Sequence, residues 1–229
     1  MNGKPGADER PALVLTGASR GIGHATVKRF SAEGWRVITC SRQAFSDKCP
    51  WPMGPEDHIQ VDLSDPENLG FAIQEIRKRL EPNGSRLNAL VNNAGISPKG
   101  ANGERLHSLT TAMHEWRTVF QVNFFAPILL GRGLFKELKN AAGSVVNVTS
   151  IAGMRVHPFA GTAYATSKAA VVQLTKSLGM ELARYKIRVN AIAPGYFRTE
   201  INEDFFDTDQ GQEFIQKGVP MRRLGQLDE

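Results

Sequence analysis

The sequence predicts an α/β fold in which one doubly wound parallel sheet lies between two layers of helices. Two observations predict it. Short apolar segments rich in β-branched residues alternate with longer segments of helical periodicity, and a glycine-rich stretch, VLTGASRGIG at 14–23, joins the first strand to the first helix. A chain of 229 residues can bury one such core, so residues 1–229 are expected to form a single domain with a flexible N-terminus at 1–10.

The first two strands are expected at 12–16 and 36–40, which are short and apolar. Between them, apolar residues at helical spacing continue to Gly34, where the first helix should end. The stretch after the second strand contains three prolines at positions 50–55. Because proline breaks helices, a loop is expected there in place of a regular crossover helix.

The remaining units follow the same alternation. A third strand at 58–63 precedes a helix that starts at 65–66, where proline suits the first turn, and runs to Leu80. Further strands are expected at 87–91, 144–149 and 188–193, and further helices at 113–138, 164–185 and 203–217. No strand is expected after the one at 188–193, so this strand would be an uncovered edge unless residues follow Glu229 or another element covers it.

Composition excludes several classes of protein. The chain is 41% hydrophobic and 22% charged, as in globular domains, and its net charge of +5 is scattered along the sequence. We therefore expect neither a nucleic-acid partner nor a membrane span, and the polar N-terminus has no apolar leader segment. The two cysteines make no metal-ligand pattern, so no metal is expected, and a reducing, cytoplasmic location fits best.

The glycine-rich stretch indicates a cradle for a dinucleotide pyrophosphate. Gly17 would make the tight turn, Gly21 would let phosphate approach the backbone, and Gly23 would let the helix lie against the sheet. The alternative is a plain strand-to-helix turn. The position of the stretch, at the first strand–helix unit of a parallel sheet, favours the cradle and a Rossmann-type fold.

The end of the second strand bears on which dinucleotide binds. That strand ends in Cys40-Ser41-Arg42, without the carboxylate that would bond the adenosine ribose of NAD. Arg42, together with Arg20 in the glycine turn, would instead hold a 2′-phosphate. The sequence therefore predicts NADP(H) in preference to NAD, the alternative being that both arginines are ordinary surface residues.

Tyr164 and Lys168 lie one helical turn apart on the same helix face. A phenol with an ordinary pKa of about 10 is a poor base at neutral pH, and a neighbouring ammonium would lower that pKa. Ser150 ends the preceding strand, at the sheet edge where ligands of such folds bind. The alternative for the pair is a partly buried tyrosine beside a lysine whose ammonium extends to solvent. The alternative for Ser150 is a serine that only closes the strand or caps a turn.

Asn123 lies four residues before Pro127, which has no N–H to bond the Asn123 carbonyl. A kink and a bound water are expected there, or a simple proline kink without chemistry.

Together these motifs resemble the classical short-chain dehydrogenase/reductase (SDR) family over about residues 12–225. The resemblance rests on TGASRGIG (16–23), VDL (61–63), NNAG (92–95), QVN (121–123), SVVNVTS (144–150), YATSK (164–168) and RVNAIAPGYFRT (188–199). The sequence is most similar to members that reduce 3-oxoacyl groups on acyl carrier protein.

The resemblance implies a catalytic set. Tyr164 would be the general acid/base, Ser150 would orient the substrate oxygen, Lys168 would tune the tyrosine and hold the nicotinamide ribose, and Asn123 would hold a water in a proton relay. The expected cofactor-binding residues are Gly17, Ser19, Arg20, Gly21, Ile22, Gly23, Ser41, Arg42, Asp62, Leu63, Asn93, Ala94, Gly95, Tyr164, Lys168, Pro194, Gly195, Phe197 and Thr199.

The sequence departs from the family pattern in three places. The loop between Ser150 and Tyr164 is one residue longer than is frequent, and the prolines after Arg42 displace the usual short helix. Family members usually continue with a further helix and a C-terminal strand, which this chain is expected to lack. Residues 96–110, 151–162 and 200–220 would form the substrate pocket, with 200–220 as its lid. Four aromatic residues there suggest an apolar substrate or simple packing: Phe159, Phe205, Phe206 and Phe214.

The predicted function is hydride transfer between NADP(H) and a ketone or secondary alcohol. Carbonyl reduction is the favoured direction, and a 3-oxoacyl thioester is one candidate substrate. The alternative is a catalytically silent NADP-binding regulator or scaffold; an epimerase or dehydratase of the extended relatives is ranked lower because their glycine spacing differs. The resemblance implies that the helices that carry Asn123 and Tyr164 pack against a second subunit in a homodimer or homotetramer.

Overall fold

Six parallel strands form one sheet in the order β3-β2-β1-β4-β5-β6. The computed structural model describes residues 10–45, 54–101, 103–199 and 203–229. The strands are β1 Ala12–Thr16, β2 Arg36–Ser41, β3 His58–Gln60, β4 Ala89–Asn92, β5 Ser144–Val148 and β6 Arg188–Ile192. The strand order reverses between β1 and β4, which confirms the doubly wound parallel sheet.

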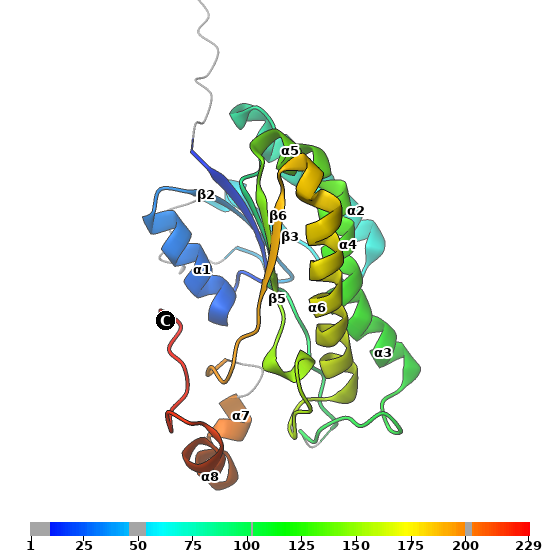
Figure 1. Cartoon of the computed structure of the whole chain (residues 1–229), viewed down its shortest axis with the longest axis vertical. Coiled ribbons are helices and arrows are strands. Elements are labelled where there is room, and N and C mark those ends of the chain that lie inside the picture. The colour runs from blue at the N-terminus through cyan, green and yellow to red at the C-terminus, as the bar shows by residue number, and fades with distance from the viewer. Residues whose placement is uncertain (1–9, 46–53, 102, 200–202) are drawn as a thin grey trace, which may run out of the picture.

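Helices cover both faces of this sheet. They are α1 Gly21–Ala32, α2 Pro66–Leu80, α3 Met113–Phe120, α4 Ala126–Gly133, α5 Phe135–Ala141, α6 Thr162–Leu182, α7 Glu203–Phe206 and α8 Asp209–Gly218. Figure 1 shows α1 on one face, α2 to α6 on the other, and α7 and α8 beyond the carboxyl ends of the strands. This edge of the sheet is where doubly wound folds bind their ligands.

The core has two parts because successive strand residues point to opposite faces. Leu13 and Leu15 pack with Val27 of α1 on one face. Ala12 and Val14 belong to a larger cluster with α2, α4 and α5 on the other. The alternation seen in β1 therefore decides which helices each residue meets.

The helix expected at 113–138 is interrupted twice: once at the position of the kink expected near Asn123, and once between α4 and α5, where no break was expected. A π-helical turn, Gln121–Phe125, separates α3 from α4, and α5 is bent by 61° from the preceding helix. The turn forms where Pro127 cannot donate, and the N–H of Ala126 bonds the Gln121 carbonyl instead. The larger bend lies at Leu134, where the Gly133 carbonyl accepts a hydrogen bond from Arg77.

Two other elements differ from the prediction, one by ending early and one by being divided. β3 stops at Gln60, and the helix expected at 203–217 is two helices because the Thr208 hydroxyl accepts from the N–H of Gly211 and starts α8. At Gly211, a Cβ would lie 2.0 Å from the Phe205 carbonyl oxygen, so only glycine lets the two helices meet this closely. Within the described ranges, β6 pairs with β5 alone and is an edge, as expected.

Several expectations concern features other than the fold. Cys40 is a buried free thiol, and no group of metal-binding side chains occurs among the residues that the structure describes. Within those ranges no single helix has the length and hydropathy of a membrane span; the bent pair Met113–Gly133 and Phe135–Ala141 passes by length and composition only, and supplies core residues. Residues 1–9, 46–53 and 200–202, which include most of the expected N-terminal segment, two loop prolines and part of the expected lid, lie outside the described residues.

Candidate functional site

A cleft of about 640 Å³ lies across the carboxyl ends of the strands, at the point where the strand order reverses. Every residue expected to contact the cofactor lines it, from Gly17 in the first turn to Thr199 after β6. Ser150 lines it as well, whereas Asn123 lies behind its wall. Residues that are far apart in the sequence therefore meet in one cavity.

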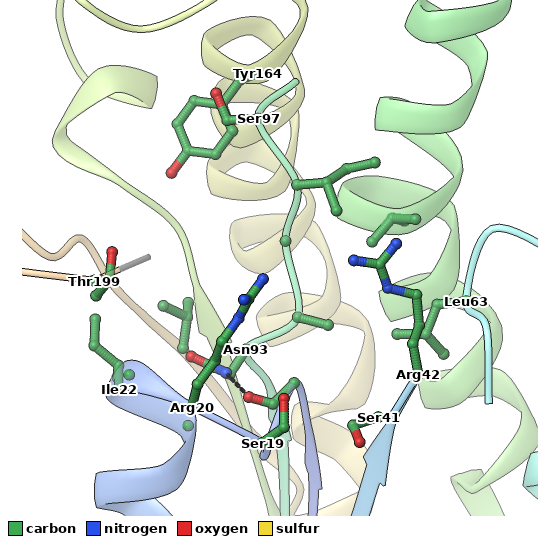
Figure 2. Close-up of a pocket in the computed structure, with 18 of the residues that line it drawn as sticks. Ser19, Arg20, Ile22, Ser41, Arg42, Leu63, Asn93, Ser97, Tyr164 and Thr199 are labelled. Atoms are coloured by element: carbon green, nitrogen blue, oxygen red, sulfur yellow. Dashed lines mark hydrogen bonds between the residues drawn. The ribbon is translucent and has the colours of Figure 1, made fainter. Parts of the chain in front are cut away.

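The β1–α1 turn has a backbone that requires glycine. Gly17 and Gly21 have φ angles of +69° and +54°, which residues with a Cβ rarely adopt. A Cβ on Gly23 would lie 2.0 Å from the Gly17 carbonyl oxygen. The Asn93 side chain donates to that carbonyl at 3.0 Å, a bond drawn in Figure 2, and holds the turn against the segment after β4.

The α1 N-terminus opens onto the cleft from this turn. Its N-cap, Arg20, makes no side-chain cap hydrogen bond. The first N–H groups of a helix otherwise lack acceptors and favour an anion. The turn therefore fits the pyrophosphate of a dinucleotide.

Arg20 and Arg42 project into the cleft from the ends of two adjacent elements. Figure 2 shows the Arg42 guanidinium on the side of the cleft away from Tyr164, and the Arg20 side chain extending from the glycine turn into the middle of the cleft. No acidic residue follows β2 directly. Asp62, after β3, is bonded locally, since one carboxylate oxygen accepts from the backbone and hydroxyl of Ser64 at 2.9 and 2.8 Å. The charge at this end of the cleft suits an additional phosphate.

Tyr164 lies at the other end of the cleft, with its hydroxyl turned toward the interior (Figure 2). Burial raises its pKa, and a hydrogen bond with Ser150 lowers it by less. The sequence predicts the opposite net direction, through the charge of Lys168. In the structure the Lys168 Nζ lies 5.8 Å from the Tyr164 ring centroid and donates to the Val148 carbonyl at 2.7 Å, so desolvation of the phenolate is the larger effect.

Lys168 is itself buried, which lowers its pKa to about 8. Its Nζ lies close to the cofactor cleft, because a Cβ on Gly95 would be 3.2 Å from it. Gly153 permits the turn after Ser150 to lie against α6, since a Cβ there would meet the Lys168 backbone at 2.6 Å. Small residues thus bring the lysine, the serine and the cleft together.

Ser150 combines both interpretations that the sequence allowed. Its hydroxyl accepts from the N–H of Ala152 at 3.1 Å and so starts the 3-10 turn Ile151–Gly153. The same hydroxyl hydrogen-bonds Tyr164. The turn fixes the direction in which the serine faces the tyrosine.

Asn123 is buried, and its side chain makes three hydrogen bonds within the protein. Its Oδ1 accepts from the Ile96 N–H at 2.8 Å, and its Nδ2 donates to the Ile96 carbonyl and the Ser167 hydroxyl, each at 3.0 Å. The π-helical turn aims this side chain inward. Asn123 therefore joins the segment after β4 to α6; the water that the resemblance assigns to it stays a prediction.

The aromatic residues of the expected pocket pack against one another. Phe159 lies 4.4 Å from Phe205 and 4.8 Å from Phe214, measured between ring centroids, and Phe206 is buried. None of these four residues, whose structure is described, is among the cleft-lining residues. Their contacts favour packing of α7 and α8 over direct substrate recognition.

Some cleft residues were not singled out from the sequence. Ser97, Pro98 and Lys99 follow β4, and Thr118 projects from α3. The first three fall in the segment 96–110 that the sequence placed in the pocket. Thr118 had no signal of its own, because its position depends on how α3 packs.

Comparison with known proteins gives a consistent result. Residues 11–210 match the family model described as short chain dehydrogenase. Protein FixR from Bradyrhizobium diazoefficiens is 54% identical, over 100% of this chain and 80% of that protein. A 3-oxoacyl-[acyl-carrier-protein] reductase from Synechocystis sp. is 30% identical, over 94% of this chain and 84% of that protein.

Among solved structures, an oxidoreductase of the short chain dehydrogenase/reductase family from Brucella ovis, in complex with a partially ordered NAD, is similar. It has 74% identity and a TM-score of 0.79, over 81% of this chain and 83% of that chain. A protein from Beutenbergia cavernae with bound NADP at low occupancy has 28% identity and a TM-score of 0.82, over 98% of this chain and 88% of that chain. Both nicotinamide cofactors thus occur among similar structures.

Proposed function

The chain belongs to the short-chain dehydrogenase family of oxidoreductases, and from this premise we propose that it transfers hydride between NADP(H) and a ketone or secondary alcohol. The observation that supports this most directly is the position of the Tyr164 hydroxyl, which faces the cleft (Figure 2) and hydrogen-bonds Ser150, while the buried Lys168 Nζ lies 5.8 Å from the Tyr164 ring centroid. The proposed catalytic residues are Asn123, Ser150, Tyr164 and Lys168.

The protein's part in this reaction is the movement of a proton. A nicotinamide cofactor held by the glycine turn and the segments after β4 and β6 would supply the hydride for reduction of the carbonyl carbon. Tyr164 donates its hydroxyl proton to the carbonyl oxygen as that oxygen gains charge, and the Ser150 hydroxyl donates a hydrogen bond to the same oxygen. The Lys168 ammonium, whose Nζ lies 5.8 Å from the Tyr164 ring centroid, would hold the nicotinamide ribose.

Carbonyl reduction is the proposed working direction. The raised pKa of Tyr164 keeps its hydroxyl protonated at neutral pH, which is the state a general acid needs. Relatives that act as 3-oxoacyl-[acyl-carrier-protein] reductases support a 3-oxoacyl thioester as a candidate substrate, although FixR, which is more similar, carries no reaction in its name.

Replacement of Tyr164 by Phe tests the chemistry. Removal of the proton donor should lower kcat about 10²- to 10⁴-fold while NADPH binding stays nearly unchanged. The measurement is NADPH absorbance during turnover of a panel of activated ketones. Thr166→Ala, a change at an exposed residue on the same helix, is the control and should behave as wild type.

The same panel separates the competing function. A catalytically silent regulator or scaffold would bind NADPH and consume none with any ketone, in wild type as in the Tyr164→Phe protein. Sustained turnover by the Tyr164→Phe protein would instead refute the assigned acid.

The preference for NADP(H) is proposed from Arg20 and Arg42, and NAD is the second candidate because it is bound in the Brucella ovis relative. Arg42→Ala removes a guanidinium that would contact the 2′-phosphate. NADPH affinity should fall about 10- to 100-fold, and NADH affinity should change little. Fluorescence titration with both cofactors checks this; tighter binding of NADH by wild type would contradict it.

A further inference from the structure

The segment that carries Arg42 has no regular structure of its own in its described part. β2 ends at Ser41, and the residues after it, as far as Phe45, form neither helix nor strand. Two backbone carbonyls of this segment are instead held by side chains from β3. These ties lie beside the cleft, which Ser41, Arg42 and Gln43 all line.

His58 holds the carbonyl of Gln43. The His58 Nε2 lies 2.9 Å from that carbonyl oxygen, which can only accept, so Nε2 carries the proton. The other ring nitrogen lies 2.9 Å from the hydroxyl of Thr39, a buried residue of β2. The ring is therefore oriented from both sides.

Gln60 holds the neighbouring carbonyl. Its side-chain amide donates to the Arg42 carbonyl oxygen at 3.0 Å. His58 and Gln60 are two positions apart on β3, so they lie on the same face of the sheet. The parallel register pairs them with Thr39 and Ser41, which places both side chains next to the segment that they bind.

A third bond closes the arrangement. The Ser41 hydroxyl donates to the same Gln43 carbonyl at 2.9 Å, so both lone pairs of that oxygen are used. Figure 2 shows Arg42 leaving this fixed backbone and reaching into the cleft. An arginine that binds a phosphate with two hydrogen bonds discriminates only when its planar group is held at the right angle.

We propose that His58 and Gln60 are positioning residues that set the cofactor preference by fixing the backbone of Arg42. The inference rests on the proposed preference for NADP(H). It predicts that loss of either side chain weakens NADPH binding and leaves NADH binding nearly as it was, because only the 2′-phosphate requires Arg42. A purely structural role would weaken binding of both cofactors together.

The experiment measures NADPH and NADH affinities by fluorescence titration for His58→Ala, His58→Gln and Gln60→Glu in the full chain. His58→Ala should lower NADPH affinity about 10-fold, as loss of an orienting partner does elsewhere. His58→Gln supplies a side-chain amide N–H in place of the ring N–H, so it should retain part of the NADPH affinity that His58→Ala loses. Gln60→Glu has nearly the same shape but places a carboxylate against the Arg42 carbonyl, so it should also weaken NADPH binding. His114→Ala, at an exposed histidine on α3, is the matched control.

A double variant and a cofactor-free measurement separate this inference from the proposed function. In an Arg42→Ala background, His58→Ala should cause no further loss of NADPH affinity. Hydrogen exchange of residues 41–45 without cofactor should speed up in both the His58→Ala and Gln60→Glu proteins. If Arg42→Ala weakens NADPH binding while the His58 and Gln60 variants match wild type, the positioning inference is overturned. If Arg42→Ala itself leaves the preference unchanged, the proposed cofactor is wrong, and the role of these residues in cofactor preference is overturned with it.

Discussion

At the scale of single residues, burial decides the chemistry of the site more than sequence spacing does. Tyr164 and Lys168 are one helical turn apart. The lysine ammonium nevertheless donates to the Val148 carbonyl and is buried away from water. Burial raises the pKa of the phenol and lowers that of the ammonium. Of the groups around Tyr164, Ser150 acts in the direction that favours the phenolate.

The role of Ser150 gives a pH prediction. Alcohol oxidation needs the Tyr164 phenolate, so its rate should rise with pH as the phenol ionises. Ser150→Ala removes the hydrogen bond that lowers the Tyr164 pKa, and the rising limb should move to higher pH. The maximal rate should fall about 100-fold, because a donor to the reacting oxygen is lost.

The measurement is kcat/KM for alcohol oxidation from neutral to alkaline pH. The control is Thr166→Ala, because the Thr166 hydroxyl bonds the Thr162 carbonyl on the surface of α6. In this variant kcat/KM should rise with pH over the same range as in wild type. If kcat/KM of the Ser150→Ala protein rises with pH over the same range as that of wild type, a group other than Tyr164 controls the pH dependence.

At the scale of elements, close approach of backbone segments shapes the cleft. The segment after β6 pairs with a later part of the chain, where the N–H of Gly225 bonds the Tyr196 carbonyl at 2.8 Å and Phe197 bridges to Gly225. A Cβ on Gly225 would lie 2.6 Å from the Phe197 ring. Phe197 lines the cleft. The contact with Gly225 therefore helps to position a side chain that would touch the cofactor.

Gly225→Ala should therefore displace the Phe197 ring and weaken cofactor binding. We expect a loss of about 5- to 10-fold in affinity, equivalent to about 1 kcal/mol, as for a modest steric strain. Fluorescence titration of the cofactor measures it. Gly70→Ala is the control: nothing lies within 4 Å of a Cβ there, and alanine should stabilise α2 by about 1 kcal/mol without affecting the cofactor. Unchanged affinity in the Gly225→Ala protein would mean that the ring moves freely.

At the scale of the whole molecule, exposed apolar side chains lie on α6 and on the turn between α3 and α4. Trp116, Phe120 and Phe124 form a row with successive ring centroids 6.2 and 6.1 Å apart. Phe125 and Met180 are exposed, Met180 by 81%. We propose that the helices that carry Asn123 and Tyr164 form the interface of a homodimer or homotetramer, since exposed apolar side chains mark association sites.

Met180→Glu would place a charge on the exposed side of α6 and should shift the protein toward the monomer. Light scattering after size exclusion measures the mass of wild type and variant at matched concentrations. Met221→Glu, an equally polar change at an exposed methionine of the C-terminal segment, should keep the wild-type mass. A wild type that is already monomeric would refute the proposed assembly.

The glycine turn and the doubly wound parallel sheet could be predicted because each depends on local physics. Gly17 and Gly21 are glycines where the backbone needs a positive φ, and the alternation of strand and helix implies parallel connections on both faces. Pro127 predicted a kink at Asn123, but the partners of the Asn123 side chain and the second break before α5 could not be predicted in the same way. The inward turn at Asn123 is completed by Ile96 and Ser167, which are distant in the sequence.

The sequence by itself determined the family, the parallel α/β sheet and the residue types that meet at its carboxyl edge, because periodicity, glycine positions and motif order are local properties of the chain. Only the tertiary structure decided the direction of the Tyr164 pKa, the bonding of Asn123 inside the wall and the ties from β3 to the Arg42 segment. These depend on burial and on hydrogen bonds between distant segments, which no local pattern encodes.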